Sequence, residues 1–453
     1  MSTALSRRQF AASLASAPAL LSQAKTPPNI VWITGEDMGP QLTCYGFPHM
    51  RTPHLDRLAG EGVRFTRAFT SAPVCSSSRS GFITGVFQTT TGTHHHRSHR
   101  KDGYTLPSFA RPIMDRLRDR GYFTCNVRQI APDVQGSGKT DFNFRADKPF
   151  DGTHWNQRQK NQPFFAHINF TAPHKGPSFP RARKQKYLVD PARIELPPYW
   201  PDHPTVRDEY ANYLDAINLL DTEVGATLDS LKKDGLLENT LVFFFGDNGR
   251  CLIRGKQWCY DAGIHIPLIA WWPGGGLKAG QVREDPVSAL DMTATSLWAA
   301  GVDLPEKRDG RPLFGDKASP REHIFAARDR CDMTLDRIRS IRTARFHYIR
   351  NFMSERPYTQ WNQYIERQYP TLGVMKELHG AGKLNANQSL FMAPRKPDEE
   401  LYDVSTDPHE VNNLASAREH QGTLLDLRAK LDRWLWESDD QGRFPESSAA
   451  QQL

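Results

Sequence analysis

Cys75 stands in a pattern of residues that favours chemistry at its side chain. The segment Pro73–Gly85 reads PVCSSSRSGFITG, so Arg79 follows the cysteine by four residues and is followed by a helical start of small residues. At the start of a helix the peptide dipoles favour negative charge, and a nearby guanidinium does the same. The pattern therefore indicates a reactive position. A small buried cysteine and a metal-binding cysteine are the alternatives that the local sequence leaves open.

Two pairs of oxygen-bearing side chains follow two apolar runs. Glu36 and Asp37 come after the run NIVWIT, Asp247 and Asn248 come after TLVFFF, and a single glycine separates run and pair in both places. Either pair alone is typical of a turn. Carboxylates held together at the end of a buried strand repel each other and lose hydration, so a divalent cation relieves both costs. All-oxygen ligands select Ca²⁺ or Mg²⁺ over Zn²⁺, and we expect Ca²⁺ here with Mg²⁺ as the alternative.

Apolar runs and helical patterns alternate along the first part of the chain. The runs of β type are residues 29–34, 63–72, 122–127, 164–170 and 240–245. Helical patterns lie between them, among others at residues 52–59 and 210–236. This alternation predicts an α/β sandwich around a large, mostly parallel central sheet. Functional groups in such sheets gather beyond the carboxyl ends of the strands, which would bring the two polar pairs together.

The sequence changes in character after about residue 316. Short apolar runs between residues 324 and 350 predict a small antiparallel sheet, and a charged helix is expected over residues 417–436. The last residues are polar. We therefore expect a large α/β domain over residues 25–316, a smaller C-terminal α+β subdomain over residues 317–440 and a disordered tail over residues 441–453.

Several motifs of this chain resemble, in the same order, those of the sulfatase family, whose members have an alkaline phosphatase-like fold. The segment Cys75–Gly85 resembles the family signature, and the run that ends at Glu36 and Asp37 resembles its opening strand. The other matches are residues 52–59, 138–141, 172–174, 255–269 and 400–415. The resemblance covers most of the chain and implies an alkaline phosphatase-like sandwich whose α/β domain is catalytic.

The resemblance implies that Cys75 is only the encoded precursor of the catalytic group. A maturation enzyme would oxidise it to formylglycine, and one oxygen of the hydrated aldehyde would attack the sulfur of a sulfate ester. A divalent cation would lower the pKa of that oxygen and neutralise the sulfate. Its ligands would be Glu36, Asp37, Cys75 in its oxidised form, Asp247 and Asn248.

The same resemblance implies roles for four basic side chains. Arg79 would stabilise the hydrated aldehyde. Lys139, Lys256 and His174 would contact the sulfate oxygens, where charge develops in the transition state. Either His174 or Lys256 would protonate the leaving alcohol, and we favour His174 because the pKa of an imidazole lies closer to neutral pH.

Three residues depart from the family pattern. Glu36 replaces an aspartate and keeps the ligand chemistry with a longer reach. Ser77 replaces the proline or alanine usual in the signature, which bears on how well a maturation enzyme accepts Cys75. Asp141 stands where a histidine often assists the release of sulfate. Either Asp141 accepts that proton, or a histidine of residues 94–99 does.

A basic run follows the signature: His94, His95, His96 and Arg97. Such a run predicts either a metal-binding tract or a loop that recognises an acidic sugar. His265, in the segment after the conserved lysine, is a further candidate for contact with the substrate.

The first residues read as an export signal. Arg7 and Arg8 precede an uncharged stretch rich in alanine and leucine, which gives a twin-arginine pattern over residues 1–24. The alternative is a basic start in front of a helix. We expect the signal to be removed and the mature protein to be periplasmic or secreted. The mature chain has no apolar run long enough for an integral membrane segment.

Composition excludes some classes of protein. The net charge of +7 is spread along the chain and forms no basic patch, so we expect no nucleic-acid partner. The six cysteines include no CxxC pair, and we expect few or no disulfides.

The function expected from these residues is hydrolysis of an O-sulfate ester or N-sulfate of a sulfated saccharide. Two alternatives remain at this point. One is a phosphonate or phosphate ester hydrolase of the same superfamily, and the other is a non-catalytic protein that binds sulfated glycans through the same basic residues.

Overall fold

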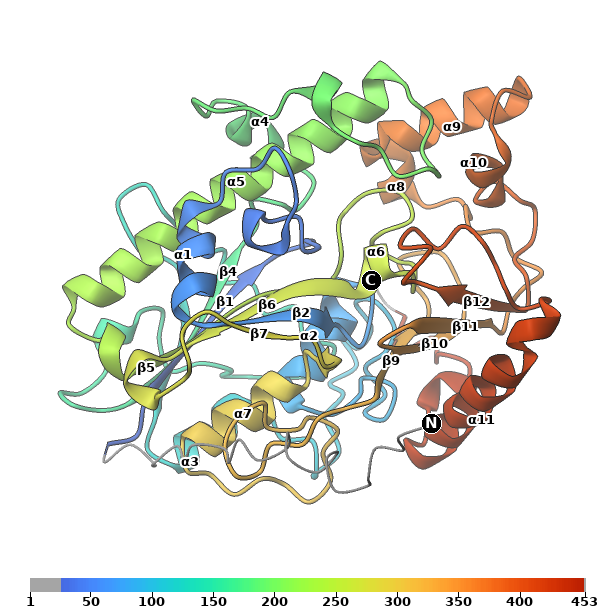
Figure 1. Ribbon diagram of the computed structural model, residues 1–453. Coiled ribbons are helices and arrows are strands. Elements are labelled where there is room, and N and C mark those ends of the chain that lie inside the picture. The colour runs from blue at the N-terminus through green and yellow to red at the C-terminus, as the bar shows by residue number, and fades with distance from the viewer. Residues whose placement is uncertain (1–25, 452–453) are drawn as a thin grey trace, which may run out of the picture.

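Two sheets of different size organise the chain (Figure 1). The computed structural model describes residues 26–451, so the export signal expected over residues 1–24 lies outside the described residues. The larger sheet has eight strands: β1 (Asn29–Gly35), β2 (Val63–Phe69), β3 (Phe123–Val127), β4 (Phe164–Phe170), β5 (Thr240–Gly246), β6 (His265–Trp271), β7 (Gln281–Arg283) and β8 (Val287–Ser288). The smaller sheet has four: β9 (His323–Arg328), β10 (Ile338–Thr343), β11 (Phe346–Asn351) and β12 (Glu399–Asp403).

Helices precede, separate and follow these strands. Those of the first part are α1 (Pro53–Glu61), α2 (Cys75–Thr84), α3 (Ile113–Asp119), α4 (Ser178–Ala182), α5 (Pro204–Lys233), α6 (Asp261–Ile264) and α7 (Asp291–Ala299). Those of the C-terminal part are α8 (Gln363–Gln368), α9 (Pro370–Gly380), α10 (Ala386–Leu390) and α11 (Gln421–Glu437).

The larger sheet is mostly parallel, as the sequence predicts, and β1 lies inside it. The strand order is β3-β4-β1-β5-β6-β2-β7, with β8 beside β2. β1 pairs in parallel with β4 and β5, so that Gly35 is opposite Phe170 and Gly246. β6 is antiparallel to both of its neighbours. The carboxyl ends of β1, β4 and β5 therefore lie side by side, and the residues that follow them meet.

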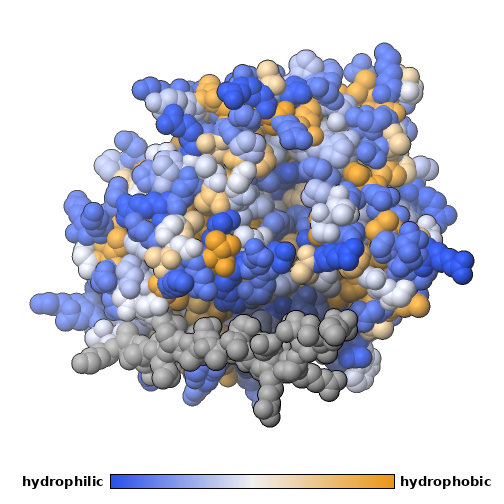
Figure 2. All heavy atoms as spheres, viewed as in Figure 1, coloured by the Kyte–Doolittle hydropathy of each residue, from blue (hydrophilic) through white to orange (hydrophobic). Residues whose placement is uncertain are grey.

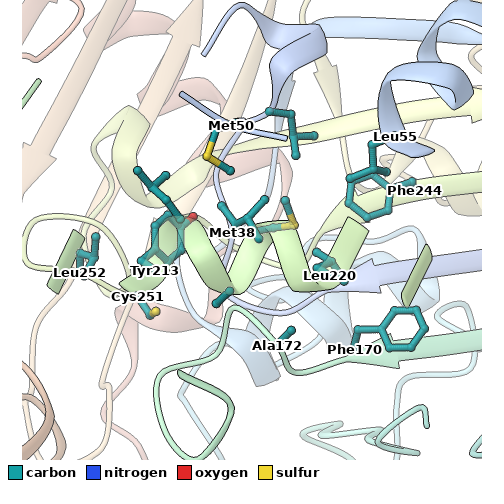
Figure 3. Packing of buried hydrophobic residues seen from close by; sticks show 14 of the residues in the cluster. Met38, Met50, Leu55, Phe170, Ala172, Tyr213, Leu220, Phe244, Cys251 and Leu252 are labelled. Carbon is teal, nitrogen blue, oxygen red and sulfur yellow. The ribbon is translucent and has the colours of Figure 1, made fainter. Parts of the chain in front are cut away.

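Alternate residues of the central strands pack on opposite faces of this sheet. On one face, Phe244 of β5 lies in a cluster with Leu220 of α5 and with Met38, which comes directly after the first acid pair (Figure 3). On the other face, the ring of Trp32 in β1 is 6.0 Å from that of Phe82 in α2. Because Phe82 fixes α2 against β1, Cys75 at the start of α2 has a fixed place relative to the acids that follow β1.

The starts of two helices differ most from those that the sequence pattern predicts, and β2 and α5 each end three residues earlier than predicted, at Phe69 and Lys233. α5 begins at Pro204, six residues before the expected start at Tyr210. The imidazole of His203 accepts the backbone N–H of Thr205 at 3.2 Å and caps the helix, and a proline fits its first turn. α11 begins at Gln421, four residues after the expected start at Ala417.

The C-terminal sheet forms its own small core with α11. The strand order β12-β11-β10-β9 is antiparallel throughout, as expected. Ile341 and Tyr348 of the sheet pack with Leu431 and Trp434 of α11, and Phe87 from the larger part joins the same cluster. The two parts therefore share buried apolar surface at this point.

The chain end differs from the disordered tail that we expected over residues 441–453. Its described part packs on the protein, because Glu446 forms an ion pair with Arg330 at 2.5 Å and Ala450 is buried. Nearby, the guanidinium of Arg339 is fully buried and contacts Asp329 and Asp440, each at 2.9 Å. The polar composition of the chain end does not reveal that its acidic residues pair with buried arginines of the folded protein.

The described surface is mainly hydrophilic on the face shown in Figure 2, with scattered apolar residues. Within residues 26–451, no helix combines the length and apolar character that crossing a membrane requires. All six cysteines lie in this described part of the chain and are free thiols.

We predict that Arg339→Ala lowers the free energy of unfolding by about 3–5 kcal/mol, since it removes the cation that pairs with buried Asp329 and one of the two that pair with buried Asp440. Urea unfolding followed by circular dichroism measures the change. Arg57→Ala is the matched control, because Arg57 and Glu61 form a half-exposed pair one helical turn apart on α1, and such pairs contribute about 0.3–0.5 kcal/mol. Equal unfolding midpoints for the two variants would contradict the prediction.

Candidate active site

Cys75 is the first residue of α2, and its side chain is only 1% exposed. Its thiol donates a hydrogen bond to Asp37 Oδ1 at 3.4 Å. Burial and the carboxylate of Asp37 raise the pKa of the thiol well above its usual value, and Lys139 and Lys256 oppose this effect without reversing it. The helix start and Arg79 favour negative charge here, but the local sequence does not show that a carboxylate faces Cys75.

The two acid pairs meet at the carboxyl ends of β1 and β5, as the sequence predicts. Glu36, Asp37, Asp247 and Asn248 are all buried. The backbone N–H of Asp37 donates to Asp247 Oδ1 at 2.8 Å, and the side-chain amide of Asn248 donates to Asp37 Oδ1 at 3.0 Å. Asp37 adopts a left-handed φ of 57°, which aspartate tolerates better than most residues and which turns the chain directly after the strand.

Three cations neutralise this cluster. The guanidinium of Arg79 donates from Nε to Asp247 Oδ2 at 3.0 Å. Lys256 Nζ donates to Asp37 Oδ2 at 2.8 Å, and Lys139 Nζ forms an ion pair with Glu36.

These cations act against the cost of burial. Burial favours the neutral form of Asp37, but Lys256 and His174 outweigh it and hold the pKa of this carboxyl below its usual range. Burial also favours neutral Glu36, and Lys139 with His174 lowers the pKa of that carboxyl in the same way.

The donor set fits a hard divalent cation. Glu36, Cys75 and Asp247 each offer a ligand atom, and these atoms lie within 4.8 Å of one another. Asn248 Oδ1 is buried and accepts no hydrogen bond from any described residue. A buried amide oxygen without a donor, beside three carboxylates, is the arrangement that Ca²⁺ or Mg²⁺ satisfies.

His174 lies at the edge of the cluster, after β4. Its Nε2 is 3.6 Å from Asp37 Oδ2 and 3.9 Å from Glu36 Oε1, and 28% of its side chain is exposed. Tyr364 of α8 lies beside it, with ring centroids 6.3 Å apart, and Lys256 Nζ is 5.7 Å from the same tyrosine ring. The C-terminal part thus contributes a wall to the site.

Sequence reasoning missed Tyr364 and Asn169. Asn169 Oδ1 accepts from Arg79 Nη1 at 2.5 Å and so helps to orient the guanidinium. Asn169 could have been found from the sequence, because it is a polar residue near the carboxyl end of a predicted strand, which pairs with β1. Tyr364 could not have been found in this way, because no sequence pattern around it indicates that α8 packs against this site.

Asp141 belongs to an ion-pair cluster at the rim of the site. It accepts from Arg100, and it lies 3.2 Å from Lys139 Nζ and 3.7 Å from Arg97 Nε. Burial would raise the pKa of Asp141, but Lys139 and the two arginines lower it well below its usual range. Such a carboxylate is a poor proton acceptor.

The basic run after α2 is clamped to the first turn of that helix. Ser77 Oγ donates to the backbone oxygen of His94 at 2.8 Å, and the backbone N–H of Arg97 donates to Ser76 Oγ at 2.8 Å. Ser77, which departs from the usual signature, thus has a structural role. The side chain of Arg97 remains 48% exposed.

The three histidines of this run are buried, and burial lowers the pKa of each. His94 and His95 pack with ring centroids 4.2 Å apart. His96 Nδ1 instead lies 2.9 Å from Asp332 Oδ1, and Cys331 Sγ is 3.7 Å from the same nitrogen. The three rings do not converge on one metal ion, because only His96 takes part in a cluster of ligand-type groups among the described residues.

His265 has different neighbours from the other candidates. Its Nε2 lies 2.9 Å from the backbone oxygen of Thr66, and its ring stacks on Phe69. It lines a cavity of about 520 Å³ together with Arg250 and Arg254, and Cys75 is not part of that lining. The structure does not bring His265 to the acid cluster.

We predict that Cys75 of native protein that retains the encoded thiol reacts slowly with iodoacetamide, because its side chain is 1% exposed. Unfolding in guanidinium chloride should make it react as fast as the other cysteines. Mass spectrometry of the tryptic peptide over residues 68–79 measures the alkylated fraction. Rapid labelling of Cys75 in the native protein would contradict the buried position.

The sequence matches known proteins over most of its length. The family model for sulfatases matches residues 28–302. An ulvan-active sulfatase of Formosa agariphila is 34% identical over 94% of this chain and 78% of its own length. The human N-sulphoglucosamine sulphohydrolase is 26% identical over 91% of both chains.

Solved structures share the fold. A protein in complex with its substrate, D-glucosamine-2-N,6-O-disulfate, aligns with a TM-score of 0.63 over 94% of this chain and all of that chain, at 18% identity. The phosphonate monoester hydrolase of Agrobacterium radiobacter aligns with a TM-score of 0.64 over 91% of this chain and 96% of its own, also at 18% identity. The family model and the relative at 34% identity agree with the motifs around Cys75, and this chain belongs to the sulfatase family of sulfuric ester hydrolases.

Proposed function

We propose that this protein removes sulfate groups, as O-sulfate esters or N-sulfates, from a sulfated saccharide, with a formylglycine formed from Cys75 as its nucleophile. The observation that carries the proposal is the place of Cys75, at the start of α2 and 3.4 Å from Asp37, with Lys139 and Lys256 on the two acids beside it. Relatives named for ulvan and for N-sulphoglucosamine support a saccharide as the substrate.

Formylglycine would supply a hydrated aldehyde whose first hydroxyl would displace the saccharide from sulfur, and whose second hydroxyl would afterwards lose its proton so that sulfate leaves and the aldehyde forms again. Around that position, Arg79 holds a positive charge that is fixed by Asp247 and Asn169. A guanidinium held in this way is oriented before the substrate arrives, so it stabilises developing negative charge without reorganisation.

Glu36, Asp37, Asp247 and Asn248 would hold the divalent cation, Ca²⁺ or Mg²⁺. The cation supplies a lower pKa for the attacking oxygen and compensates the charge of the sulfate. Lys139 and Lys256 now neutralise Glu36 and Asp37. With those carboxylates engaged by a cation, both ammonium groups are available to bind sulfate oxygens.

His174 is the acid that we assign to the leaving alcohol. Its side chain is 28% exposed and faces solvent, whereas that of Lys256 is 5% exposed. The saccharide must leave towards solvent, so the exposed imidazole is better placed to protonate it. Imidazole also exchanges protons near neutral pH.

Release of sulfate needs a base that accepts the proton of the second hydroxyl of the hydrated aldehyde. We assign this role to His96 in preference to Asp141. Asp141 is paired with Lys139, Arg97 and Arg100, which stabilise its ionised form. His96 has Asp332 at Nδ1, and its Nε2 has no hydrogen-bond partner among residues 26–451. A carboxylate behind one ring nitrogen orients the imidazole and stabilises its charged form after it takes a proton.

We predict that Cys75→Ala abolishes hydrolysis of 4-nitrophenyl sulfate, because it removes the precursor of the nucleophile, while the circular dichroism spectrum stays that of the wild type. Protein from a host with a maturation enzyme should carry an aldehyde in the tryptic peptide over residues 68–79. Full activity with only a thiol at position 75 would rule out the mechanism. Faster hydrolysis of an aryl phosphonate than of the aryl sulfate would instead support the phosphonate hydrolase alternative.

We also predict that Ca²⁺ raises the melting temperature of the protein after treatment with a chelator, and that Asn248→Ala weakens the Ca²⁺ affinity about tenfold or more. Differential scanning calorimetry over a Ca²⁺ titration measures both effects. Asn412→Ala, at an exposed position in the C-terminal part, is the matched control and should titrate like the wild type. Identical titrations for all three proteins would show that Asn248 is no ligand.

A further inference from the structure

We propose that Trp361, Met333 and Arg97 form the subsite for the saccharide part of the substrate, in which the indole stacks on the apolar face of a sugar ring and the guanidinium pairs with an acidic group of the sugar. The proposal rests on the proposed function, since it takes a sulfated saccharide as the substrate. It concerns where that saccharide lies and which of its groups are recognised.

A partly buried chain of hydrogen bonds joins three loops from distant parts of the sequence. His96, in the loop after α2, lies with Nδ1 2.9 Å from Asp332 Oδ1 in the loop after β9. The other oxygen of Asp332 accepts from the side-chain amide of Asn362, just before α8, at 3.3 Å. These three side chains fix the loops against one another.

Each of these three hydrogen-bonded residues has an exposed neighbour in the sequence. The three neighbours are large side chains, two of them apolar and one a guanidinium. Arg97 follows His96, Met333 follows Asp332, and Trp361 precedes Asn362. Their exposed fractions are 48% for the side chain of Arg97, 46% for Met333 and 63% for Trp361. The backbone N–H of Gln363 donates to Met333 Sδ at 3.4 Å, so the methionine and the tryptophan loops are in contact.

The same loops are anchored to the reaction centre on two sides. The backbone N–H of Arg97 donates to Ser76 Oγ, in the first turn of the helix that starts at Cys75. On the other side, Tyr364 lies two residues after Asn362 and has Lys256 Nζ 5.7 Å from its ring. The loops that carry the exposed residues are therefore tied to the first turn of the Cys75 helix and to the segment beside Lys256.

The chemistry of these side chains selects an acidic saccharide. An exposed indole offers a flat apolar face, and sugar rings present C–H groups on one side that pack on such a face. Exposed large apolar side chains gathered at a site opening mark a binding surface. Arg97 pairs with Asp141 through Nε at 3.7 Å while 48% of its side chain stays exposed, so its other guanidinium donors can reach a carboxylate or a second sulfate.

Binding can be measured apart from catalysis in the Cys75→Ala background. Isothermal titration calorimetry with ulvan oligosaccharides, which carry both sulfate and uronate groups, should show that Trp361→Ala weakens binding about tenfold. Trp436→Ala is the matched control, because Trp436 is an exposed tryptophan at 84% on α11. Equal affinity for the two variants would overturn the assignment of Trp361, whether or not the wild type proves to be a sulfatase.

Two substitutions at Arg97 separate the contribution of its charge from that of its planar guanidinium. Arg97→Lys keeps the charge, and Arg97→Ala removes both. Both variants should weaken binding of ulvan oligosaccharides, the alanine variant more than the lysine variant. A loss with ulvan but none with D-glucosamine-2-N,6-O-disulfate, which has no carboxylate, would identify a uronate as the partner, and a loss with both would identify a second sulfate. No loss with either would overturn the role of Arg97.

Steady-state kinetics of Trp361→Ala in the otherwise unchanged enzyme completes the test. We expect KM to rise about tenfold for the ulvan oligosaccharides while kcat changes little, and we expect a much smaller rise in KM for 4-nitrophenyl sulfate, which carries no sugar. A parallel loss of kcat on both substrates would indicate a purely structural role and would overturn the proposal. Absence of turnover by the wild type on both substrates would instead count against the proposed function.

Discussion

The structure depends on one electrostatic constraint, which is that Glu36, Asp37 and Asp247 are buried together at the ends of two adjacent strands. Two like charges 4 Å apart repel by about 4 kcal/mol even at an effective dielectric constant near 20. The fold offsets this cost with three cations, of which Arg79 and Lys256 are buried and Lys139 is partly buried. Arg79 comes from α2, Lys256 from the loop after β5, and Lys139 from the loop after β3. Their ion pairs with the acids hold α2 and these two loops close together beyond the carboxyl ends of the strands.

This arrangement places opposite charges where a sulfate and a cation can both be bound. The carboxylates and Asn248 offer oxygen ligands, and the lysines offer donors that a sulfate can take over. Cys75 lies between the two sets, held by α2, and the apolar contact of Phe82 with Trp32 keeps α2 against the sheet. The hydroxyls of the first turn of α2 then bind the loop that carries the histidines. The site is preorganised because each of its charged groups already has a partner.

The two parts of the protein contribute differently to this site. The strand ends of the larger sheet supply the acids, while α2 supplies Arg79 and the loops after β3 and β5 supply the two lysines. The smaller part supplies Asp332 and Asn362, which hold the loop of His96, together with Tyr364 beside His174 and the exposed Trp361. Under the proposed function, this division would leave the reacting centre at the strand ends and place recognition on loops. A shared apolar cluster around Phe87 and Trp434 holds the two parts together.

The sequence by itself determined the parallel sheet, its central strands and the meeting of the two acid pairs, because alternating patterns and residues that follow strands are local signals. Tertiary structure alone decided the state of Cys75, the pairing of Asp141 with three cations and the packing of the polar chain end. The local pattern favours negative charge at the helix start, yet burial and Asp37, thirty-eight residues away, raise the pKa of that thiol. Burial and charge pairing join distant residues, so no window of sequence contains them.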